Sequence, residues 1–171
     1  LHKITNDSEL LKSLDWFKSR TEEQNNLEAP IIRKPFFCSG CPHNSSLKVP
    51  EGKRALGGIG CHYMAVDSIE STEFFTQMGG EGTPWIGIAP FSHEKHVFAN
   101  LGDGTYKHSG ILAIRASLDA QVNITYKILY NDAVAMTGGQ EIGSNWDVEG
   151  IVKQVLAEGV KKVSILSENP K

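Results

Sequence analysis

The stretch Asn100-Leu101-Gly102-Asp103-Gly104, followed 28 residues after Asp103 by Asn131-Asp132, decides the fold that we predict for this chain. An apolar strand pattern over 96–101 precedes it, and a helix pattern over 107–121 and a second strand pattern over 123–130 follow. This order predicts a βαβ unit, whose right-handed crossover makes the two strands parallel. Asp103 and Asn131 are then expected side by side at the carboxyl edge of the sheet.

The residue types at this edge predict a site for a metal ion and a diphosphate. Asp103 offers a carboxylate and Asn131 an amide oxygen, and both suit Mg²⁺ that is held together with phosphate groups. Gly102 and Gly104 let the backbone approach a phosphate closely, and the helix that begins here presents unpaired N–H groups. A Gly-Asp-Gly turn with a solvated aspartate is the common alternative, but the flanking strands and helix favour the binding site.

The remainder of the chain continues the alternation of strands and helices. Further strand patterns cover 54–59, 73–78 and 160–166, helix patterns cover 62–68 and 148–158, and residues 85–91 fit either state. This alternation predicts an α/β fold with a doubly wound, mostly parallel sheet. Most glycines fall in four clusters, 57–60, 79–82, 102–104 and 138–143, which are expected to converge on the same edge.

The amino-terminal part is expected to be separate from this domain. Residues 5–24 predict an amphipathic helix, and we assign 1–28 to a helical lead-in or linker and 29–171 to the domain itself. The chain does not begin with methionine, and we expect it to be a piece of a larger protein.

Composition excludes several classes of protein. The 171 residues carry a net charge of −3, with 40% hydrophobic and 22% charged residues, which is typical of a soluble globular domain. Nothing in this balance predicts binding to nucleic acid or to a membrane, and no apolar run is long enough to span a bilayer. Three cysteines and no secretion signal favour a reducing compartment, so we expect a cytoplasmic protein.

Several separate motifs resemble the fused indolepyruvate ferredoxin oxidoreductases, a branch of the 2-oxoacid:ferredoxin oxidoreductases. The motifs are FFCSGCPHNSS (36–46), GGIGCHYMA (57–65), GDGTYKHSGILAIRA (102–116) and ITYKILYNDAVAMTGGQ (124–140). The Gly-Asp-Gly to Asn spacing is similar to the thiamine-diphosphate-binding motif. The resemblance runs from about 35 to 140 and implies the thiamine-diphosphate-binding type of α/β fold.

The resemblance also implies a set of cofactor-binding residues. Mg²⁺ would be bound by Asp103, Asn131 and the carbonyl oxygen of Ala133, whereas Asp132 receives no ligand role. The full set expected to contact thiamine diphosphate is Gly102, Asp103, Gly104, Thr105, His108, Asn131, Ala133, Thr137 and Gln140. For His108 a place on the helix surface is an equally good interpretation.

The cysteines form a second group of candidate ligands. Cys38 and Cys41 have the Cys-x-x-Cys spacing of two ligands to one metal, and Cys61 follows Gly-Ile-Gly. The resemblance implies that these three bind a [4Fe–4S] cluster whose fourth ligand lies outside this chain. From the residues alone, a zinc site completed by His43 or His62 and a set of free thiols both remain open.

The function implied by the resemblance is the oxidative decarboxylation of a 2-oxo acid, such as indolepyruvate or another arylpyruvate, to an acyl-coenzyme A. Coenzyme A, ferredoxin and the remaining domains or subunits of the enzyme would be the partners. The activating glutamate of this superfamily comes from a separate domain, so we assign no catalytic residue here and expect this piece to be inactive alone. Two alternatives stay open: a non-oxidative thiamine-dependent decarboxylase domain, and a zinc-stabilised binding domain without catalysis.

Overall fold

The computed structural model describes residues 8–26, 34–68, 71–143 and 147–169, and it divides the chain into two compact units, 1–34 and 35–171. The first unit contains helix α1 (Ser8–Asn25), which buries none of its side chains. This helix matches the amphipathic pattern over 5–24, of which residues 5–7 lie outside the described part. The assignment of 1–28 to a lead-in and 29–171 to a domain stays a prediction.

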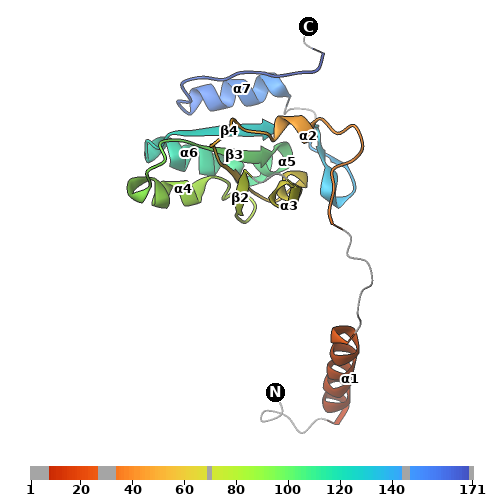
Figure 1. Ribbon diagram of the computed structural model, residues 1–171. Helices are drawn as coiled ribbons and strands as arrows, with labels where there is room; N and C mark the ends of the chain where they lie inside the picture. Colours follow the sequence, from red (N-terminus) through yellow and green to blue (C-terminus); the bar gives the residue numbers. More distant parts are fainter. Residues whose placement is uncertain (1–7, 27–33, 69–70, 144–146, 170–171) are drawn as a thin grey trace. The chain divides into compact units, whose positions relative to one another are not determined.

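The second unit is built on a parallel sheet. In the described residues this sheet has four strands, β1 (Ala55–Gly57), β2 (Thr72–Phe75), β3 (Val97–Gly102) and β4 (Ile124–Leu129). Their order is β2-β1-β3-β4, and every neighbouring pair is parallel (Figure 1). The predicted α/β fold with a parallel sheet is therefore confirmed.

The helices and short elements of this unit lie before, between and after these strands along the chain. They are α2 (His43–Ser46), η1 (Cys61–Met64), α3 (Ala65–Ser68), α4 (Thr83–Ile88), η2 (Ala89–Phe91), α5 (Asp103–Thr105), the π-helix η3 (Tyr106–Gly110), α6 (Ile111–Asp119), η4 (Ala135–Thr137) and α7 (Val148–Ala157). None of the helices that the structure describes is long and apolar enough to cross a membrane.

Two segments differ from the simplest expectation. The ambiguous segment 85–91 is helical, because Gly82 caps α4 with φ of 84° and Pro84 occupies its first turn. The strand predicted over 160–166 is wrong: in the described part of the chain this segment pairs with no strand, although Val160 and Val163 pack against the core. Ile165 and Leu166 are exposed, so the apolar residues of this segment are only partly packed.

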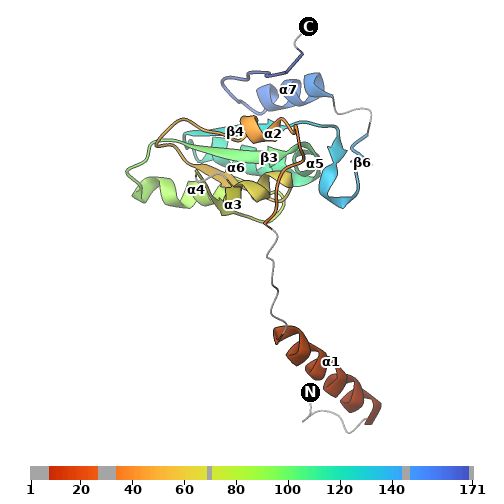
Figure 2. The ribbon, with the colours of Figure 1, turned by 45° about the vertical axis from the view of Figure 1, so that its right-hand side comes forward.

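Both faces of the sheet are covered. Val97, Ala99 and Leu101 are buried on one face of β3 in clusters that also contain Trp85 of α4 and Ile114 of α6. Leu129 projects from the other face of β4 and packs with Leu47 and Ala65. Helix α7 lies beyond β4, on the side away from β2 (Figures 1 and 2). This arrangement confirms the doubly wound topology.

The βαβ unit brings the two candidate loops together. Strands β3 and β4 pair in continuous register from Val97 opposite Ile124 to Gly102 opposite Leu129. Because both strands end at the same level, Asp103 at the start of α5 lies next to the turn that follows β4. The structure thus places Asp103 beside the turn that follows β4, as the spacing in the sequence predicts.

The sheet edge at β2 is unusual in its side chains. Phe74 is 51% exposed and Phe75 is 53% exposed. The register between β1 and β2 shifts between Thr72 and Phe75, and the two exposed aromatic rings stand on this irregular edge strand.

Two helical glycines give a matched test of the packing. A Cβ on Gly110 would lie 2.8 Å from Leu101 Cδ1, whereas a Cβ on Gly87 of α4 meets no atom within 4 Å. We expect Gly110→Ala to lower the free energy of unfolding by about 1–3 kcal/mol, because it overpacks the helix against β3. Gly87→Ala should leave it unchanged or raise it by up to about 1 kcal/mol. Urea denaturation of both variants checks the pair, and equal effects would contradict the close packing at Gly110.

Candidate functional site

The carboxylate of Asp103 joins the two loops at the carboxyl edge of the sheet. Asp103 is 4% exposed, and its Oδ1 accepts a hydrogen bond of 2.8 Å from the N–H of Gly104. Its Oδ2 accepts hydrogen bonds of 2.7 Å from the N–H groups of both Asn131 and Asp132. The structure therefore brings Asp103 and Asn131 together, as their spacing predicts.

The turn after β4 is shaped by these contacts. Asn131 Oδ1 accepts a hydrogen bond of 3.1 Å from the N–H of Ala133, and Asp132 adopts a left-handed φ of 57°. Asp132 thus contributes its backbone N–H to the Asp103 carboxylate. The N–H groups of Asn131 and Asp132 thereby hold this turn on the Asp103 carboxylate.

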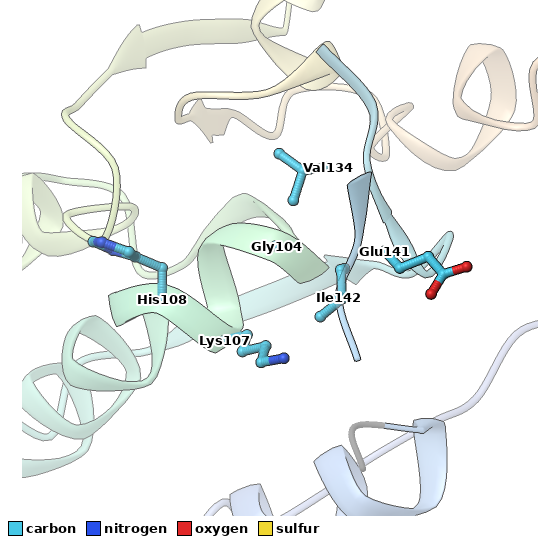
Figure 3. Close-up of a pocket in the computed structure, with 6 residues that line it drawn as sticks. All are labelled: Gly104, Lys107, His108, Val134, Glu141 and Ile142. Carbon is cyan, nitrogen blue, oxygen red and sulfur yellow. The ribbon is translucent and has the colours of Figure 1, made fainter. Parts of the chain in front are cut away.

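A pocket of about 320 Å³ opens beside the start of the helix that follows β3. Its lining consists of Gly104, Lys107, His108, Val134, Glu141 and Ile142 (Figure 3). A side chain on Gly104 would narrow it, since a Cβ there would lie 3.1 Å from Val134 Cγ2. The predicted Gly104 and His108 meet here, and the carboxylate of Glu141 points away from the helix.

Lys107 is the basic one of the four lining residues that the sequence interpretation missed, and the others are Val134, Glu141 and Ile142. It follows Gly104 by three residues, so the two share one helix face, a spacing that identifies Lys107 in retrospect. Its Nζ lies 2.9 Å from the position that a Cβ on Gly143 would take. Lys107 therefore brings a positive charge to the pocket wall.

The segment predicted as the Thr-Gly-Gly-Gln loop is a small hairpin. Strand β5 (Ala133–Val134) pairs antiparallel with β6 (Gln140–Glu141). Between them the Thr137 hydroxyl donates to Gln140 Oε1, and Gln140 Nε2 donates to the Thr137 carbonyl at 2.7 Å. Both side chains therefore form hydrogen bonds within the hairpin, and both are exposed.

Two other predicted contacts have partners within the chain. Thr105 is buried, and its hydroxyl donates a hydrogen bond of 3.2 Å to the carbonyl of Ile59. The hydroxyl is therefore used within the chain, whereas the backbone N–H of Thr105 belongs to the first turn of the helix. His108 is exposed, with its Nδ1 2.8 Å from Ser109 Oγ. Gly102 lies against the ring of His62.

Comparison with known proteins places this geometry in a family. Residues 58–162, more than half of the chain, match the family described as the thiamine pyrophosphate enzyme, C-terminal TPP binding domain. The chain belongs to this family. Thiamine pyrophosphate is another name for thiamine diphosphate, and the matched range contains the Asp103 carboxylate and the turn around it.

The curated relatives share one description. Indolepyruvate oxidoreductase subunit IorA of Archaeoglobus fulgidus is 29% identical over 151 residues, which cover 77% of this chain and 24% of the relative. The subunit of the same name from Thermococcus kodakarensis is 27% identical over 150 residues, covering 76% of this chain and 23% of the relative. The chain thus spans about a quarter of the length of these relatives. No solved structure gives a significant match.

The residues of this TPP-binding domain fit Mg²⁺. Asp103 Oδ2 uses both of its lone pairs on N–H groups, whereas Oδ1 accepts from Gly104 as its one partner among the described residues and keeps one lone pair. Asn131 Oδ1, which accepts from the Ala133 N–H, adds a neutral oxygen in the same turn, and the Ala133 carbonyl stays a predicted ligand. One carboxylate with neutral oxygens is the donor set expected for Mg²⁺ that also binds phosphate.

The cysteine-bearing segments lie near this edge of the sheet. Burial raises the pKa of the Cys61 thiol, and the neighbouring Cys41 and Cys38 raise it further. Burial lowers the pKa of His43, while the carboxylate of Asp103 opposes that change. Among the described residues no group of three or more His, Cys, Asp and Glu side chains is arranged to hold a metal ion. The iron–sulfur ligand set stays a prediction.

Proposed function

We propose that this chain supplies the Mg²⁺-diphosphate half of the active site of a thiamine-diphosphate-dependent 2-oxo acid:ferredoxin oxidoreductase. The observation that carries the proposal is the Asp103 carboxylate, which ties the Gly-Asp-Gly helix start to the Asn131–Ala133 turn. Membership of the TPP-binding family and the similarity to indolepyruvate oxidoreductase subunits support it. By that similarity, indolepyruvate or a related arylpyruvate is the proposed substrate and an acyl-coenzyme A the product.

Each residue of the site has a proposed task. Asp103, Asn131 and the Ala133 carbonyl hold Mg²⁺, and the N–H groups at Gly104 and Thr105 bind the diphosphate. Lys107 adds a positive charge at the pocket wall. Bound thiamine diphosphate supplies the carbon nucleophile that attacks the 2-oxo acid and the ring that accepts the electrons after loss of CO₂.

The cysteines have a proposed role in electron transfer. Cys38, Cys41 and Cys61 are the proposed ligands of a [4Fe–4S] cluster, completed by a ligand from the remaining enzyme, that passes electrons to ferredoxin. Iron content and visible absorption of the anaerobically prepared enzyme, with all its domains or subunits, test this role. Stoichiometric zinc without iron would overturn it and favour the zinc-stabilised alternative.

Calorimetric titration of the chain with thiamine diphosphate tests the central proposal. We expect binding in the presence of Mg²⁺ and none after chelation of divalent ions, because the diphosphate reaches Asp103 through the metal. Absence of Mg²⁺-dependent binding would contradict the proposal. With the remaining domains present, release of CO₂ and free aldehyde without an electron acceptor would identify a non-oxidative decarboxylase instead.

A further inference from the structure

Glu81 is a carboxylic acid enclosed by the protein. Its exposed fraction is 0%, and none of its described contacts is with a lysine or arginine. Burying a carboxyl without an opposite charge is costly unless its oxygens are hydrogen-bonded. Its sequence context, Gly79-Gly80-Glu81-Gly82, would suggest a solvated turn, so the burial calls for a physical reason.

The side-chain carboxyl of Glu81 connects two loops at the edge of the sheet where the strands end. Its Oε2 accepts a hydrogen bond of 2.8 Å from the N–H of Gly79, and its Oε1 accepts a longer one of 3.4 Å from the N–H of Ile59. Gly58 provides the space for it, because a Cβ there would lie 2.0 Å from Glu81 Cγ. The backbone carbonyl of Glu81 is fixed in turn by the Tyr126 hydroxyl at 3.0 Å.

Ile59 is held on both of its backbone polar groups. Its N–H faces Glu81, and its carbonyl accepts the hydrogen bond from Thr105, at the start of the helix proposed to bind the diphosphate. Cys61 follows two residues later in the same loop. The loop that carries Cys61 is therefore clamped between the buried carboxyl and the diphosphate helix.

We propose that Glu81 is a positioning residue that fixes the Gly58–Gly60 loop and thereby holds Cys61 at its place on the cofactor edge. The link to a cofactor rests on the proposed function, whereas the effect on Cys61 does not. Burial raises the pKa of the Glu81 carboxyl, and the N–H groups of Glu81, Gly79 and Ile59 oppose that rise.

The reactivity of the Cys61 thiol measures the position of this loop. In a chain with Cys38→Ser and Cys41→Ser, Cys61 is the remaining cysteine, and its alkylation by iodoacetamide is followed under native conditions at fixed pH. Glu81→Gln keeps the shape of the side chain but turns one acceptor oxygen into a donor that faces an N–H group. Because the loop then loses a hydrogen bond, we expect alkylation to be about tenfold faster.

Two control variants separate positioning from general loss of stability. Val155→Ala removes buried atoms from α7 in the same unit and touches neither anchor of this loop, and Glu51→Gln repeats the chemical change at an exposed turn; both should alkylate at the parent rate. An unchanged rate in Glu81→Gln, or an equal acceleration in Val155→Ala, would overturn the proposal.

A second measurement does not depend on the folding of a variant. Amide hydrogen exchange in the parent chain should show slow exchange at Gly79 and Ile59, although both lie in loops. Rapid exchange at both would also overturn the role of Glu81. Failure of the parent to bind Mg²⁺ and thiamine diphosphate, with Glu81→Gln still accelerating alkylation, would refute the proposed function and leave the positioning role intact.

Discussion

Asp103→Asn is expected to lower the affinity of the chain for Mg²⁺-thiamine diphosphate by at least about 100-fold. The variant loses the negative charge at the metal, and one of its two terminal atoms becomes a donor. If the amide nitrogen faces Asn131 and Asp132, both N–H groups lose their acceptor; if it faces Gly104, the metal loses its ligand atom. Hydrogen bonds to charged groups contribute about 1.5–3 kcal/mol each, and 1.4 kcal/mol is tenfold in affinity.

Calorimetry of the parent and the variant at fixed Mg²⁺ concentration measures this effect. Asp119→Asn, at the exposed end of α6, is the matched control and should bind like the parent. Thermal unfolding without cofactor gives a second comparison, because the lost loop contacts should also lower the melting temperature of Asp103→Asn. Parental affinity in Asp103→Asn would refute the assignment of the metal site.

Acidification is expected to destabilise the metal-free chain through His62. This side chain is 2% exposed, its Nε2 has no hydrogen-bond partner among the described residues, and burial together with the nearby His43 lowers its pKa to about 4. The unfolded chain takes up the proton near the ordinary pKa of 6.5, whereas the folded chain does so near 4. The stabilisation is therefore complete above pH 6.5 and is lost as the pH falls to 4, by about 3 kcal/mol in total.

Urea denaturation of the metal-free chain at several pH values between 4 and 7 measures this slope. His62→Phe removes the titrating group and keeps an aromatic ring of similar size, so the difference between parent and variant should grow in favour of the variant as the pH falls. The same slope in both proteins would contradict the buried neutral state of His62. The proton resonances of the His62 ring should also move near pH 4 rather than near 6.5.

The central geometry of the site could be predicted because it depends on local order and a general rule. A strand, a glycine-rich turn, a helix and a second strand leave a single arrangement in which Asp103 and Asn131 meet. The short spacing of Gly104 and His108 along the helix is equally local. These features need no knowledge of what packs against them.

Other features depend on distant residues and could not be read from their own segments. Glu81 is buried because Gly58, in another loop, has no side chain, and His62 is neutral because the fold encloses it. The hairpin that contains Thr137 and Gln140 combines the pairing of β5 with β6 and two hydrogen bonds between these residues, which a Gly-Gly pair does not reveal. The strand expected over 160–166 is wrong for a related reason, since a strand needs a neighbouring strand and an apolar segment alone does not provide one.

The exposed aromatic rings of β2 have a practical consequence for solubility. An edge strand with unpaired backbone groups and apolar side chains invites a second molecule to add to the sheet. Preparations of this chain should therefore self-associate as the concentration rises, through the edge rather than through the cofactor loops. A charged residue at position 74, as in Phe74→Lys, is the substitution that should keep the chain monomeric for the titrations described above.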